Sequence, residues 1–102
     1  MNSPSVTTKA QLIKILAREK PLLAARFGVR SLSLFGSAAR DELNDSSDID
    51  LLVEFDGPST ARAYFGTQFY LEDILGRPVD LVTQRALRAE LRPMIEREAI
   101  LV

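Results

Sequence analysis

This 102-residue chain contains neither histidine nor cysteine. Without cysteine it has no disulfides, no thiolate metal ligands and no cysteine nucleophile. Without histidine it has no imidazole-bound zinc, no Ser-His-Asp triad and no side chain whose ordinary pKa lies near neutrality. Any catalysis by this chain must therefore use carboxylate and hydroxyl groups.

Long apolar runs and a large excess of either charge are also missing. No stretch is apolar enough to span a bilayer and there is no N-terminal signal pattern, so we expect a cytoplasmic protein without membrane association. The 13 basic and 14 acidic residues leave a net charge of −1, which disfavours broad electrostatic binding of nucleic acid. With 46% hydrophobic and 26% charged residues, the composition is that of a soluble globular domain.

Hydrophobic periodicity and turn residues divide the chain into alternating helices and strands. Residues 1–102 read as a single domain, of which Met1–Val6 is a loose terminus. The first half is expected to form a helix with a Thr8–Gln11 capping box that kinks or ends near Pro21, a strand at Val29–Phe35, a short helix at Ser37–Leu43 capped by Ser37, and a strand at Asp48–Phe55. The second half is expected to form a helix from Ser59 or Thr60 to Leu75, a strand at Val79–Val82, a helical segment interrupted by Pro93, and a small strand at Ala99–Val102. This order predicts an α/β (α+β) fold with a small mixed β-sheet flanked by helices.

Two aspartates open the most hydrophobic run of the chain. In a strand, Asp48 and Asp50 would project to the same face, about 6.5–7 Å apart. Adjacent carboxylates repel each other, and Mg²⁺ is normally held by one or two carboxylates together with substrate phosphates. Asp80, between two aliphatic residues, would add a third carboxylate. The alternative roles are a turn or capping acid for Asp48 and an ordinary strand-edge acid for Asp80.

Gly36-Ser37 joins a predicted strand to a predicted helix. Glycine would let an anion approach the backbone, where the N–H groups of the first helical turn and the Ser37 hydroxyl could bind it. Arg40 could hold phosphate or anchor an acid. An ordinary strand-to-helix turn with a serine cap is the alternative. Because a triphosphate of about −4 charge needs metal ions to sit beside carboxylates, the combination suggests metal-assisted nucleotidyl transfer.

The pattern Gly36-Ser37-x-x-Arg40, Ser47-Asp48-x-Asp50 and Asp80 resembles the DNA polymerase β-like nucleotidyltransferase superfamily. Within it, the chain is similar to the minimal nucleotidyltransferases, single-domain antitoxins usually encoded beside a HEPN-domain toxin. The resemblance implies the nucleotidyltransferase fold, ATP as substrate and two Mg²⁺ ions. It implies catalytic and metal-binding roles for Asp48, Asp50 and Asp80, and nucleotide binding by Gly36, Ser37, Arg40 and Ser47.

The resemblance also implies an activity and a partner. An antitoxin of this family can transfer AMP from ATP to a tyrosine of its HEPN toxin, a protein adenylyltransferase reaction of the EC 2.7.7 type (AMPylation) that blocks the ribonuclease. We expect a hetero-oligomer with such a toxin. Neutralisation of the toxin by binding alone, and nucleotidyl transfer to RNA or a small molecule, are the alternatives.

Two further features bear on these expectations. Relatives often carry glycine after the motif arginine, whereas this chain has Asp41, which would bring negative charge near the phosphate site. The aromatic residues of the 60–75 helix are expected to form core packing and a partner-facing edge. They are Tyr64, Phe65, Phe69 and Tyr70.

Overall fold

Four strands form one mixed sheet in the computed structural model of this protein, which describes residues 8–44, 47–58 and 60–102. The strands are β1 (Val29–Phe35), β2 (Ile49–Phe55), β3 (Val79–Thr83) and β4 (Ile100–Leu101), in the spatial order β3-β2-β1-β4. β1 is antiparallel to β2 and β4, whereas β2 and β3 are parallel. The predicted small mixed sheet is confirmed; the expected loose terminus, Met1–Val6, lies outside the described residues.

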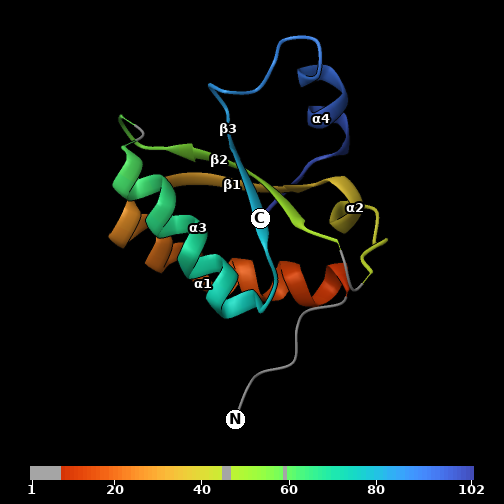
Figure 1. Ribbon diagram of the computed structural model, residues 1–102, viewed down its shortest axis with the longest axis horizontal. Helices are drawn as coiled ribbons and strands as arrows, with labels where there is room; N and C mark the ends of the chain where they lie inside the picture. Colours follow the sequence, from red (N-terminus) through yellow and green to blue (C-terminus); the bar gives the residue numbers. More distant parts are fainter. Residues whose placement is uncertain (1–7, 45–46, 59) are drawn as a thin grey trace.

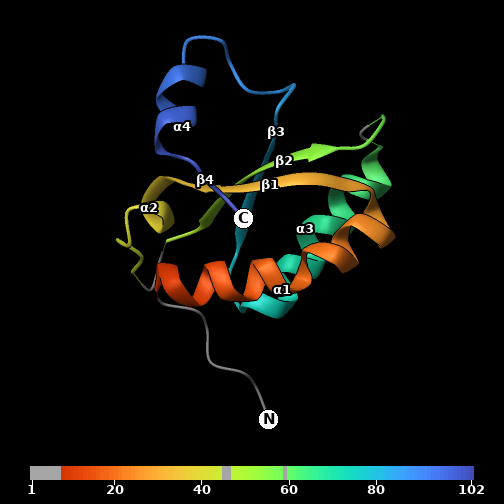
Figure 2. The same ribbon diagram turned by 180° about the vertical axis from the view of Figure 1, so that it is seen from behind.

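Helices α1 (Lys9–Phe27) and α3 (Ala61–Leu75) contact each other and cover one face of the sheet (Figure 1). α4 (Arg92–Glu98) lies on the other side, as the reverse view in Figure 2 also shows. The main core lies between the sheet and the α1–α3 pair. It includes Leu12, Leu16, Leu23, Leu32, Leu34, Ile49, Leu51, Val53, Leu71, Leu75, Val79 and Leu81. None of the helices in the described ranges has the length and apolarity needed to cross a membrane.

The second face of the sheet is only partly covered. A small cluster formed by Leu52, Leu87 and Ile95 packs there, with Phe35 and Val82 against it. Because strand side chains alternate, a residue next to a core position of β2 or β3 points to this second face. Asp50 and Asp80 are such residues, so their carboxylates lie on the side away from α1 and α3.

Sequence signals locate the ends of α1 well. Thr8 forms the predicted capping box with Gln11, and Gly28 ends the helix in the left-handed conformation. Of the two alternatives predicted at Pro21, a kink or an end of the helix, the end does not occur, since α1 continues through the proline to Phe27. Leucines in the turns on both sides of the proline are fully buried in the main core, and this packing outweighs the lost backbone hydrogen bond.

The short helix after β1 differs from the expectation. α2 covers only Gly36–Ala39, and no side chain caps it, so the predicted cap by Ser37 and the extension to Leu43 are both wrong. The chain leaves the helix because Asp41 adopts a left-handed backbone with φ of 58°. Downstream, α3 is capped by Thr60, one of the two expected capping residues; Ser59 lies outside the described residues. Pro93 lies in the first turn of α4 and does not interrupt it.

Side chains from α3 satisfy the outer edge of β3. Glu72 Oε2 accepts a hydrogen bond from the Val79 backbone N–H at 2.9 Å, and Gln68 Nε2 donates to the Val79 carbonyl at 3.2 Å. The Tyr64 hydroxyl donates to the carbonyl of Leu81. Edge strands otherwise present unpaired backbone groups, so these contacts fix β3 to α3 as well as to β2.

Candidate active site

Asp50 and Asp80 are directly paired across the parallel ladder of β2 and β3. Neighbouring strands lie about 4.8 Å apart, so the two carboxylates stand side by side on the second face of the sheet. The pKa of Asp50 is raised from 3.8 to about 6, first by burial and then by the negative charges of Asp80 and Asp48. This is a concentration of negative charge that a bound cation would relieve.

Asp48 lies close to this pair without joining it. It is exposed and precedes β2, which begins at Ile49 and not, as predicted, at Asp48. Its charge nevertheless raises the pKa of Asp50. Within residues 8–44, 47–58 and 60–102, no three acidic side chains converge closely enough to hold a metal ion between them. The structure therefore brings Asp50 and Asp80 together and leaves Asp48 at the margin of the pair.

Gly36 lies against the Asp50 carboxylate. It follows Phe35, which pairs with Asp50 across β1 and β2, and its φ of 69° is in the left-handed region. A Cβ built on Gly36 would overlap Asp50 Oδ2 and lie 3.0 Å from Asp50 Cγ. Only glycine leaves this space open, and the neighbouring Ser37 is half-buried at the start of α2.

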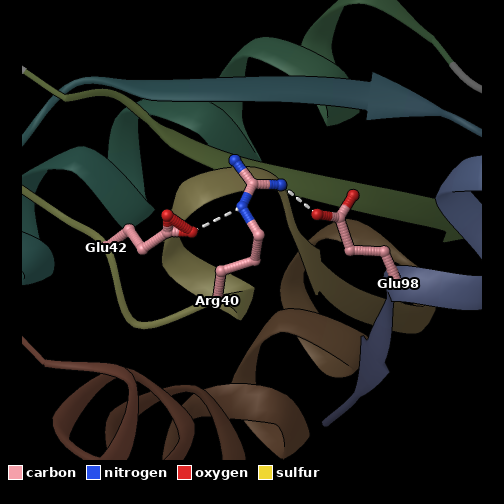
Figure 3. A network of polar contacts seen from close by, with 3 residues as sticks. All are labelled: Arg40, Glu42 and Glu98. Carbon is pink, nitrogen blue, oxygen red and sulfur yellow. Dashed lines mark hydrogen bonds and ion pairs between the residues drawn. The ribbon is translucent and has the colours of Figure 1, made fainter.

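Arg40 is held between two glutamates (Figure 3). Its Nε donates to Glu42 Oε1 at 2.8 Å, and its Nη1 donates to Glu98 Oε1 at the end of α4. The Arg40 charge also lowers the pKa of Asp50, so the guanidinium lies within electrostatic reach of the site. Of the two roles considered for Arg40, the structure displays the anchoring of acids.

Asp41 has a role that the sequence did not suggest. Its Oδ1 accepts a hydrogen bond of 2.8 Å from the backbone N–H of Lys9, at the start of α1. Carboxylates are favourable at helix N-termini, so Asp41 ties the segment after α2 to the first turn of α1. The glycine that the family resemblance led us to expect at this position was the available signal, because glycine marks a left-handed backbone.

Arg77 is the second residue that the sequence did not reveal. Only 7% of its surface is exposed, and its Nη2 donates to the carbonyls of Asn44 and Ser47, just before Asp48. Tyr64 bonds to the backbone of β3 from α3, and burial, and then the charge of Asp80, raise the pKa of its hydroxyl. A buried arginine next to a strand gives no distinctive sequence pattern, so the two hydrogen bonds of Arg77 were not predictable.

The donor set at this site fits Mg²⁺. The paired carboxylates of Asp50 and Asp80 supply hard oxygen ligands, their mutual repulsion favours a cation, and Gly36 leaves the space beside Asp50 open. Mg²⁺ in proteins is usually bound by one or two carboxylates, while substrate phosphates and water complete its coordination. A pair of carboxylates with a third nearby is sufficient for that arrangement.

A small mixed sheet with paired aspartates on its open face and a glycine turn beside them is the arrangement of a nucleotidyltransferase. A sequence model described as the nucleotidyltransferase domain matches residues 10–102, and the chain belongs to this family of enzymes. Protein adenylyltransferase MntA of Thermococcus cleftensis is 35% identical over 98 residues, which cover 96% of this chain and 99% of the relative.

Solved structures agree with this assignment. A structure assigned to a minimal nucleotidyltransferase is 36% identical and superposes with a TM-score of 0.82, over 95% of this chain and 98% of the other. A complex of tri-AMPylated Shewanella oneidensis HEPN toxin with its MNT antitoxin contains a chain of the same fold, with a TM-score of 0.57 and 22% identity over 91% of this chain and 66% of the other. At that identity the likeness concerns the fold alone.

Proposed function

We propose that this chain is a Mg²⁺-dependent protein adenylyltransferase that transfers AMP from ATP to a hydroxyl, a tyrosine hydroxyl, of a HEPN-type toxin and so neutralises it. The observation that carries the proposal is the in-register pair of Asp50 and Asp80 beside Gly36. A relative covering nearly the whole chain bears the name protein adenylyltransferase, and a neighbour of the same fold was solved with an AMPylated HEPN toxin. The name of the relative supports a protein as the acceptor.

The three carboxylates share one role in this proposal, and Asp80 has a second. Asp48, Asp50 and Asp80 would hold Mg²⁺, which when bound would offset the negative charge of the triphosphate and of the departing pyrophosphate. Asp80 would accept the proton of the acceptor hydroxyl, whose ordinary pKa of about 10 makes it a poor nucleophile at neutral pH. The hydroxyl oxygen then bonds to the α-phosphorus, and the bond from that phosphorus to the pyrophosphate oxygen breaks.

The remaining motif residues would bind the triphosphate. The Gly36 backbone can approach it closely, and the hydroxyls of Ser37 and Ser47 can donate hydrogen bonds. Arg40 would contribute by exchanging one of its two glutamate partners for phosphate, because a guanidinium binds either group in the same way.

Intact-protein mass spectrometry tests the activity. The chain is incubated with ATP, Mg²⁺ and the HEPN-domain protein encoded beside it, and the partner should gain AMP-sized mass increments. Asp50→Asn and Asp80→Asn should abolish the increment. Asp56→Asn, an exposed aspartate just beyond the far end of β2, is the control that should retain it. No increment with any divalent metal, or an unchanged rate in Asp50→Asn, would reject the proposal.

Neutralisation by binding alone is the second candidate, favoured by an exposed aromatic pair on α3. Phe65 and Phe69 are 50% and 61% exposed, and their rings stack with centroids 6.1 Å apart. Exposed apolar groups of this kind are typical of protein contacts. If Asp48→Ala combined with Asp50→Ala still inhibits the toxin, binding is sufficient; if inhibition is lost while the complex still forms, transfer is required.

A further inference from the structure

Arg77 makes its recorded contacts with the backbone that leads to Asp48. It lies between the end of α3 and the start of β3, and its Nη2 donates to the Asn44 carbonyl and, at 2.8 Å, to the Ser47 carbonyl. A buried guanidinium is costly unless hydrogen bonds replace its hydration. The contacts to these two carbonyls therefore contribute to fixing both the arginine and the segment it holds.

The two ends of that segment also bond to each other. The Asn44 N–H donates to Ser47 Oγ at 3.2 Å, and the Ser47 N–H donates to the Asn44 carbonyl at 3.1 Å. Arg77 thus binds two residues that are also hydrogen-bonded to each other, and the second of them, Ser47, immediately precedes Asp48. The hydrogen bond to Ser47 restrains the residue that follows it.

Asp48 is tied to the same short segment from its other side. The N–H of Ile49 donates to the Pro78 carbonyl at 3.0 Å. The neighbours of Asp48, Ser47 and Ile49, are therefore bonded to the consecutive residues Arg77 and Pro78. Two residues further on, the same segment carries Asp80, so residues 77–80 set the position of Asp48 relative to its partner carboxylates.

We propose that Arg77 is a positioning residue, which places Asp48 for metal binding beside Asp50 and Asp80. The inference deepens the proposed function and rests on it. Asp50 and Asp80 are held by the ladder of β2 and β3, but Asp48 precedes β2 and is not. Loss of the Arg77 hydrogen bonds would release the Ser47 side of Asp48 and leave the paired carboxylates in place.

Two substitutions separate hydrogen bonding from packing. Arg77→Met keeps an unbranched apolar stem without donors, whereas Arg77→Lys keeps a cationic donor on a shorter chain. Arg92→Met is the matched control, because Arg92 also holds a backbone carbonyl, that of Gln84, through its Nη2 at 3.0 Å. Among the described residues, Arg92 bonds to Gln84 and pairs with Glu96, and it contacts neither Asn44 nor Ser47. Its loss should therefore leave metal binding unchanged.

The primary readout is the affinity for Mn²⁺ as a probe metal, measured by titration calorimetry on the full chain with a non-hydrolysable ATP analogue. Arg77→Met should weaken Mn²⁺ binding at least tenfold, because outer-shell partners typically contribute 10–100-fold to metal affinity. Arg77→Lys should recover part of that loss, and thermal unfolding reports whether each variant is folded. In transfer assays, the Mg²⁺ concentration for half-maximal rate should rise in the same order.

Each outcome decides the inference. A folded Arg77→Met that binds Mn²⁺ as tightly as the unsubstituted chain overturns it, as does an equal loss in Arg92→Met or the absence of Mn²⁺ binding in the unsubstituted chain. If Arg77→Met does not fold, Arg77→Lys decides: a weakened Mn²⁺ affinity supports the inference and an unchanged one overturns it. Mn²⁺ binding without AMP transfer in the unsubstituted chain rejects the proposed function, and the Mn²⁺ comparison still tests Arg77.

Discussion

Gly36 and Asp50 are so close together that no side chain fits between them: a Cβ on residue 36 would overlap the Asp50 carboxylate. The turn that begins α2 therefore lies directly against one of the paired acids. A ligand bound to Asp50 would also lie against the Gly36 backbone. The two motifs that are widely separated in the sequence meet at this contact.

Gly36→Ala should abolish AMP transfer, because its methyl group displaces the Asp50 carboxylate. It should also cost about 1–2 kcal/mol of stability, since Gly36 has a positive φ. Gly57→Ala is the matched control: its φ is also positive, at 100°, but an added Cβ would meet nothing within 4 Å. Urea unfolding should show a loss of stability for both variants, and the mass-shift assay should show a loss of AMP transfer for Gly36→Ala only. Equal transfer rates in Gly36→Ala and Gly57→Ala would contradict the contact between Gly36 and Asp50.

Asp41→Ala should destabilise the protein by about 1–2 kcal/mol. It removes the acceptor for the Lys9 N–H and places alanine in a left-handed conformation. Asp41→Asn keeps an oxygen acceptor, and asparagine tolerates a left-handed backbone, so its loss of stability should be smaller. Asp41→Gly loses the hydrogen bond but removes the strain of the left-handed backbone, so its stability should lie between those of the other two variants. Urea midpoints measure the series, and an Asp41→Ala variant as stable as Asp41→Asn would refute this role.

The metal-free protein should become less stable as the pH rises from about 4 to about 6. In the folded chain the pKa of Asp50 is about 6, above its ordinary 3.8, so the folded state binds the proton more tightly than the unfolded state. Stability from this group is present below pH 4 and is lost as the pH rises through 6. Urea unfolding in EDTA should show this loss, and Asp50→Asn should reduce it. An equal pH dependence in the variant would contradict the origin assigned here.

Glu72→Leu should cost about 1–3 kcal/mol, because it leaves the partly buried N–H of Val79 without its acceptor. Glu72→Gln keeps a carbonyl oxygen and should cost less. Asp73→Leu changes an exposed residue on the same turn and should stay within about 0.5 kcal/mol. Chemical denaturation compares the three variants. If Glu72→Leu and Asp73→Leu behave alike, α3 does not hold the outer edge of β3 in the way the structure indicates.

The strands and long helices were predictable because their signals are local. Alternation of apolar residues marked β1, a continuous hydrophobic run marked β2, and the capping residues Thr8 and Thr60 marked the starts of α1 and α3. A carboxylate from Asp80 on the same face as Asp50 was also expected, since both acids lie among aliphatic residues on strands, but the direct pairing of the two was not. These features depend on the repeat of a helix or a strand, which the spacing of apolar residues in the sequence follows.

The side-chain contacts that complete the site were not predictable. Arg40 reaches Glu98 across 58 residues, and Arg77 reaches the carbonyls of Asn44 and Ser47 across 30 or more. Such contacts depend on how the elements pack, and a single sequence carries no periodic signal for them. The role of Asp41 was misjudged for the same reason, because its partner is a backbone N–H 32 residues away.

The register of β2 against β3 has a consequence for how the enzyme can fail. If β3 slid by one residue, Asp80 would turn toward α1 and α3, and Val79 and Leu81 would turn toward water. A molecule that misaligns its acids must therefore also lose its core. Chains that complete their hydrophobic packing have these two carboxylates aligned. A molecule with the slipped register would therefore be unfolded, and a stable, folded form that is inactive for this reason should not accumulate.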